Sequence, residues 1–152
     1  METTRLSRHI RAPRPVVYRA LLDREAVQRW MVPDTMTSQV HSFDAREGGT
    51  FRISLTYDAP TGAGKTTAQT DSFHGRFVTL RPDEQVVQAV EFETDDPALQ
   101  GEMTITYLLV DADGGTMLTG VHENLPPGVS PADNELGTSM AIDKLAKLVE
   151  ER

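Results

Sequence analysis

The sequence of 152 residues contains no cysteine, which excludes disulfides, thiolate chemistry and cysteine-ligated zinc sites. Basic residues are also few, because 15 Lys and Arg stand against 23 Asp and Glu and give a formal net charge of −8. Nucleic acids and anionic lipids are bound by basic surfaces, so neither is an expected partner. No apolar run approaches the ~18 residues of a membrane span, and no signal peptide is apparent. We therefore expect a cytoplasmic protein without a membrane span.

The remaining composition is that of an ordinary folded domain. Apolar residues make up 38% of the chain and charged residues 25%. A chain of this length suits one domain and is short for two. We therefore expect a single domain over residues 1–152.

The N-terminal part of the chain changes from a strand pattern to a helical one. Residues 4–11 alternate as a strand, and Pro15 fits the first turn of a helix. Asp23 can cap a second short helix, which the segment 31–33 ends with a proline. The sequence thus predicts two short helices after the first strand.

The middle of the chain alternates with the period of strands. The clearest case is residues 51–57, where apolar and polar side chains follow each other strictly. Further strands are expected around residues 40–44, 73–77, 86–92, 103–107 and 117–123. The run 111–115 reads as a hairpin turn. The order predicts antiparallel pairing of successive strands.

The C-terminal segment is predicted to be one long helix from Pro131 towards Glu150. Ser130 supplies its N-cap, and a single apolar stripe runs along the segment. Such a helix must bury its stripe against a sheet. The fold class expected is α+β, with a curved antiparallel sheet of about six to seven strands around the helix.

Several motifs in this order carry a resemblance to a known family. They are Ala12-Pro13, residues 17–21, Asp23, Glu25, Trp30, Pro33, residues 44–51, Gly75 with Pro82, Gly115-Thr116, Gly137 and residues 142–145. With them the chain resembles the SRPBCC (START-like) helix-grip superfamily, in the AHSA-like branch named for homologues of the heat-shock-chaperone ATPase activator. The resemblance spans nearly the whole chain and implies an apolar cavity between the sheet and the C-terminal helix.

Two residues depart from what this family often carries. Thr138 stands where tryptophan is common, and Gly120 stands where a bulky aliphatic residue is common. Both differences remove side-chain volume near the implied cavity. We therefore expect a wider or more open pocket than is usual in the branch.

Apolar residues on the inward faces of the strands are the candidate walls of this cavity, although a filled core would use the same residues. The candidates are Phe51, Ile53, Tyr57, Phe73, Phe77, Phe92, Met103 and Ile105. Trp30 and Met140 are expected near the entrance. Trp30 could equally serve to anchor its short helix on the core.

Two polar residues fall on the same inward faces. Gln88 shares a face with apolar neighbours on its strand, and His122 lies beside the small Gly120. A buried polar group needs a hydrogen-bond partner, from the protein or from a ligand. His122 could donate to a bound carbonyl, act as an acid or base, or simply be satisfied by a neighbour. The adjacent Glu123 points to the opposite face of the strand and does not form a dyad with it.

Motifs for metal, nucleotide or nucleophilic chemistry are weak. The histidines are scattered without ligand spacing, so neither a metal site nor a cofactor is expected. Residues 59–66 fit a relaxed P-loop pattern, but no helix is predicted after them and the flanking strands alternate. The segment 58–67 is instead expected to be a loop between antiparallel strands, near one end of the cavity and able to act as a lid.

The sequence thus favours non-covalent binding of a small apolar or amphipathic molecule. Gln88 and His122 would orient the polar end of that molecule. The resemblance leaves two alternatives, a polyketide cyclase- or aromatase-like enzyme that uses His122, and a chaperone-regulating interaction protein. A homodimer also remains open.

Overall fold

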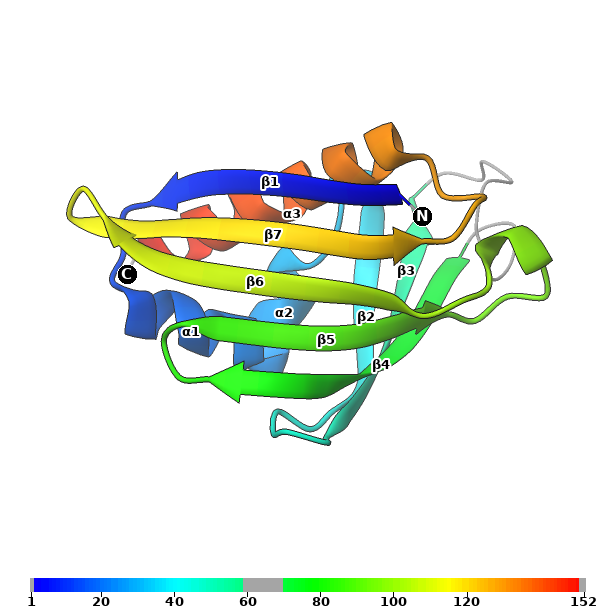
Figure 1. Ribbon diagram of the computed structural model, residues 1–152, viewed down its shortest axis with the longest axis horizontal. Coiled ribbons are helices and arrows are strands. Elements are labelled where there is room, and N and C mark those ends of the chain that lie inside the picture. The colour runs from blue at the N-terminus through cyan, green and yellow to red at the C-terminus, as the bar shows by residue number, and fades with distance from the viewer. Residues whose placement is uncertain (1, 59–69, 151–152) are drawn as a thin grey trace.

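The computed structural model describes residues 2–58 and 70–150, in which seven strands form one sheet beside two short helices and a long one (Figure 1). In chain order the elements are β1 (Glu2–Ile10), α1 (Arg14–Leu22), α2 (Arg24–Trp30), β2 (Met36–Phe43), β3 (Thr50–Tyr57), β4 (Thr70–Arg81), β5 (Gln85–Phe92), the 3-10 turn η1 (Pro97–Leu99), β6 (Met103–Ala112), β7 (Gly115–Leu125) and α3 (Pro131–Glu150). The predicted α+β class and order of elements are confirmed.

The sheet is an antiparallel meander with the first strand added beside the last. Its strand order is β1-β7-β6-β5-β4-β3-β2, and each neighbouring pair is antiparallel. Register shifts interrupt the pairing of β1, β2 and β4, and such irregularities bend a strand. Figure 1 shows β2 and β3 crossing steeply behind the other strands. The sheet is therefore strongly curved, and its concave face receives the helices.

The turns and caps form where the local sequence favours them. Asp23 caps α2, because its carboxylate accepts from the backbone N–H of Glu25 at 3.0 Å. The β6–β7 hairpin turns through Asp113 and Gly114, with φ of 46° and 77°. Ser130 Oγ accepts from the N–H of Asp133 at 3.3 Å and begins α3. These three predictions are confirmed.

The two halves of α3 have different roles. Its buried residues all lie in the second half: Ile142, Leu145, Ala146 and Val149. That half is also tied to the sheet edge, since Arg8 on β1 pairs with Asp143 at 2.8 Å. Packing by the second half anchors the helix and leaves the first half to cover the rest of the concave face.

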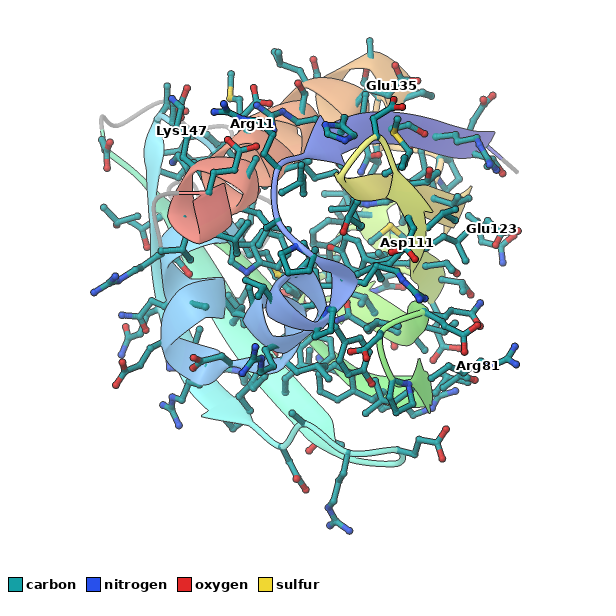
Figure 2. The ribbon with its side chains drawn as sticks, turned by 90° about the vertical axis from the view of Figure 1, so that its left-hand side faces the viewer. Arg11, Arg81, Asp111, Glu123, Glu135 and Lys147 are labelled. Atoms are coloured by element: carbon teal, nitrogen blue, oxygen red, sulfur yellow. The ribbon has the colours of Figure 1, made fainter. Side chains whose placement is uncertain are left out.

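Most charged side chains of the described residues lie on the outside of the molecule, whereas Asp71 is buried. Figure 2 shows the labelled Arg81, Glu123 and Glu135 at the outline of the molecule, pointing away from its centre. Glu123 is exposed, as expected from strand alternation. Within the described ranges, no helix has the length and apolarity needed to cross a membrane.

Candidate functional site

A cavity of about 590 Å³ lies between the concave face of the sheet and the first half of α3. Its walls come from α3, from strands β2 to β7, and from the connections that follow α2 and β7. Most of the lining side chains are apolar. Thr35, Asp133 and Leu136 line the cavity and are also exposed, so they mark the side on which it reaches the surface.

Most of the residues expected at the site lie on this cavity. They are Trp30, Tyr57, Phe73, Gln88, Phe92, Met103, Ile105, His122 and Met140. They come from α2, β3, β4, β5, β6, β7 and α3, so seven elements converge on one space. Their contact with a ligand stays a prediction.

Phe51, Ile53 and Phe77 do not line the cavity. The rings of Phe51 and Phe77 lie 5.2 Å apart, and Phe43 packs against both. Phe51 also covers Gly75, where a side-chain Cβ would come within 2.7 Å of its ring. Ile53 has no exposed area at all. These three residues share the inward face with the cavity walls, but they belong to the closed core.

Gly120 does not open onto the cavity either. A Cβ built there would lie 3.6 Å from Ile142 Cδ1 and 3.9 Å from the ring of Tyr107. Tyr107 is its cross-strand partner on β6. The space left by this glycine is therefore taken by two side chains that do line the cavity. The other departure, Thr138, lies on the lining itself.

Trp30 anchors its short helix on the core and also lines the cavity. Its indole N–H donates to the carbonyl oxygen of Ala20 at 2.9 Å, which joins α2 to α1. Its ring meets Tyr107 edge to face, with centroids 6.1 Å apart. Although only 1% exposed, Trp30 still lines the cavity. It is a buried wall residue rather than a residue of the entrance.

His122 is the most unusual polar group of the lining. It is 8% exposed, and its Nδ1 lies 3.2 Å from the side-chain amide of Asn134 on α3. Asn134 in turn accepts from the hydroxyl of Thr4 at 2.6 Å. The other ring nitrogen, Nε2, is buried and has no partner among the described residues.

The surroundings of His122 favour its neutral form. Burial lowers its pKa from 6.5 to about 4, because a low-dielectric environment penalises the charged ring. At neutral pH the ring is therefore an uncharged hydrogen-bonding group. This weakens the hypothesis of an acid–base role, since an effective catalytic acid or base has a pKa near the working pH.

Other polar groups of the lining include the amide of Gln88 and two carboxylates. Gln88 is 2% exposed and lies two strands from His122, with Ile105 paired between them. Asp71 on β4 and Asp133 at the start of α3 also line the cavity. No Lys or Arg among residues 2–58 and 70–150 does so.

Some lining residues were not anticipated from the sequence. Tyr107 continues the alternation of Met103 and Ile105, so the strand pattern predicts that it faces inward. Asp71 precedes Phe73 by two positions, so the same alternation predicts that it faces inward. Asn134 carries no such signal, because its first-turn position indicates only a helix start.

The remaining motifs do not point to another chemistry. No group of three potential metal ligands occurs in the part of the chain that the structure describes. β3 and β4 pair antiparallel across residues 50–56 and 70–76, which excludes the parallel crossover of a P-loop fold. The expected loop and lid at residues 58–67 lie, apart from residue 58, outside the described residues.

A curved antiparallel sheet that grips a long C-terminal helix is the fold of an SRPBCC-type helix-grip protein. The family described as activator of Hsp90 ATPase homolog 1-like protein matches residues 11–150, and the chain belongs to this family.

Solved structures agree with this assignment. A protein from Chromobacterium violaceum is 34% identical, with a TM-score of 0.86 over 97% of this chain and 96% of its own. A protein from Rhizobium loti is 26% identical, with a TM-score of 0.75 over 96% and 95%. The AHSA1-like protein from Aeromonas hydrophila is 16% identical, with a TM-score of 0.72 over 99% and 93%, and shows the shared fold. No protein of curated function matches the chain.

Proposed function

We propose that this protein binds a small apolar or amphipathic molecule non-covalently in the cavity under α3. The carrying observation is the cavity itself, whose volume of about 590 Å³ is typical of small-molecule sites. Its lining is mostly apolar with a few convergent polar groups, which is the usual form of such sites.

The construction of α3 supports this proposal. The second half of the helix supplies the buried anchor residues, so the first half can span a space without filling it. Thr138 lies in that first half, is half-buried, and contributes a short side chain to the lining. A large ring at this position would occupy the space that a ligand needs.

Binding of the neutral fluorescent probe N-phenylnaphthylamine tests the proposal. We expect a saturable rise in its fluorescence with the native protein. Thr138→Trp should abolish that rise by filling the cavity. Glu135→Trp is the matched control, because Glu135 is exposed on the same helix and is not part of the lining. Equal binding by both variants, or no binding by the native protein, would contradict the proposal.

Chaperone association is the second candidate, and the description of the matching family favours it. The same variants separate the two functions. A partner that docks on the outer surface should remain bound to Thr138→Trp, whereas a small ligand should be lost. The uncharged state of His122 at neutral pH makes an enzymatic role the weakest of the three hypotheses.

A further inference from the structure

We propose that the free edge of β1 binds an extended peptide segment of another protein as an additional antiparallel strand, with an acidic side chain of that segment opposite Arg5. This inference concerns the border of the sheet and does not depend on the cavity. Three observations carry it: backbone groups of β1 that have no partner, a cover that closes the opposite border of the sheet, and the unpaired charge of Arg5.

The register of the sheet determines which backbone groups of β1 point away from β7. Ala112 and Gly115 pair around the two-residue loop of the β6–β7 hairpin, so they exchange backbone hydrogen bonds. Alternate residues of β7 therefore bond to β6, and those between them bond to β1. Ile10 of β1 accordingly turns its carbonyl oxygen towards β7, where it would collide with a Cβ at Gly115. By the same alternation, the N–H and C=O groups of Arg5 and Ser7 lie on the free edge.

These edge groups are accessible to a partner. Arg5 and Ser7 are exposed, and their backbone groups form no hydrogen bond outside the sheet with any described residue. Figure 1 shows β1 at the border of the sheet, with α3 crossing behind it. The strand is held in place by α3, since Arg8 pairs with Asp143 at 2.8 Å. A fixed strand with unpaired backbone groups is a template for an added strand.

The other border of the sheet, β2, is closed by α2. Gln28 accepts from the N–H of Val40 at 3.1 Å, and Arg24 donates to the carbonyl oxygen of Val40 at 2.7 Å. Among the described residues, β1 has a comparable cover only at His9, whose carbonyl oxygen accepts from the Arg8 side chain at 3.3 Å. The part of β1 that precedes His9 is therefore the open edge.

The side chains along this open edge indicate the chemistry of the partner. Arg8 and Arg11 are paired with carboxylates of α3, whereas Arg5 forms no ion pair with a described residue. Opposite charges on directly opposed residues stabilise a pair of strands, so an acidic residue opposite Arg5 is favoured. The next residue, Leu6, is half-buried against the core and favours an apolar residue opposite it.

A second copy of this chain fits the same edge less well. Each chain has a net charge of −8, so two copies repel each other. Antiparallel pairing of two β1 strands centred on Arg5 or on Leu6 would place the two Arg5 side chains directly or diagonally opposite each other. Like charges in such positions are destabilising. The partner is therefore a segment of a different protein.

Binding of the peptide acetyl-Val-Thr-Val-Glu-Val-amide tests the proposal. In antiparallel pairing its threonine lies opposite Ser7 and its glutamate opposite Arg5. Amide NMR of the native protein at low salt should show saturable shifts at Arg5 and Ser7. A peptide N-methylated at threonine and glutamate should not bind, because those N–H groups face β1. A matched peptide, N-methylated at the second and third valines, should bind as well as the parent peptide.

A charge exchange tests the contact with Arg5. Arg5→Glu should weaken binding of the parent peptide about fivefold. Lysine in place of the glutamate of the peptide should restore the affinity for this variant. Arg81→Glu is the matched control, because Arg81 is exposed on β4 and three strands separate β4 from β1.

Four results would overturn the inference. They are failure of the parent peptide to bind, equal binding by the two N-methylated peptides, shifts confined to residues outside β1, and dimerisation of the native protein that protects the amides of Arg5 and Ser7. In the last case a second copy would occupy the edge. None of these results bears on the binding of N-phenylnaphthylamine in the cavity, so the two proposals fail separately.

Discussion

The burial of His122 predicts a specific dependence of stability on pH. The pKa of this ring is about 4 in the folded protein, against 6.5 for an unperturbed histidine. As the pH falls below 6.5, the unfolded chain binds a proton that the folded protein still excludes. The stabilisation from the neutral buried ring is therefore complete above pH 6.5 and is lost progressively as the pH falls to about 4.

The size of the effect follows from the difference between the two pKa values. At about 1.36 kcal/mol per pH unit, the whole loss is about 3 kcal/mol. Between about pH 7 and about pH 5, some 2 kcal/mol of it should appear. This is a large part of the stability of a typical domain, so it is readily measured.

Urea denaturation of the native protein and of His122→Gln at both pH values measures this contribution. The variant has no titrating group at this position, and both proteins share the same carboxylates, so the difference between their pH dependences isolates the histidine. We expect the native protein to lose about 2 kcal/mol more than the variant on acidification. Parallel losses in the two proteins would refute the reasoning, whatever their absolute stabilities.

Further predictions concern packing and the cavity entrance. Leu145→Ala should lower the free energy of unfolding by about 2–5 kcal/mol, whereas Met140→Ala should cost less than about 1 kcal/mol because the half-buried Met140 lines an open space. Gly75→Ala should be strongly destabilising, since its Cβ would overlap a backbone carbonyl oxygen of β5. Gly120→Ala should be tolerated, because its Cβ would lie at ordinary contact distances from its neighbours. Thermal unfolding of the two variants measures the difference in stability. Lys144→Met removes contacts of 2.9 and 3.3 Å to the segment between α2 and β2, so stopped-flow mixing with N-phenylnaphthylamine should show faster entry and exit of the probe.

The elements of this fold could be predicted because each depends on local sequence. The strict alternation of residues 51–57 defines a strand, and Asp23 and Ser130 mark helix starts through bonds to N–H groups two or three positions later. Periodicity also assigns a face to each strand residue. It therefore identified both Phe51 and Tyr57 as inward-facing.

Periodicity does not reveal where along the concave face a residue lies. Phe51 and Tyr57 share a face, yet the first packs in an aromatic cluster and the second lines the cavity. That division depends on how far the second half of α3 and the two short helices cover the sheet, which is a property of tertiary packing. The hydrogen-bond partners of His122 could not be predicted from the sequence for the same reason. Thr4 and Asn134 are 130 positions apart, and no local pattern joins them.

NMR of isotope-labelled methionine methyl groups tests the central claim most directly. Among the described residues, Met31, Met36, Met103 and Met140 line the cavity, whereas Met117 on β7 does not. On titration with N-phenylnaphthylamine we expect saturable ring-current shifts at the four lining methyl groups and an unchanged Met117 signal. Shifts confined to Met117, or unchanged signals from all four lining methionines at a saturating concentration of the probe, would contradict ligand binding in this cavity.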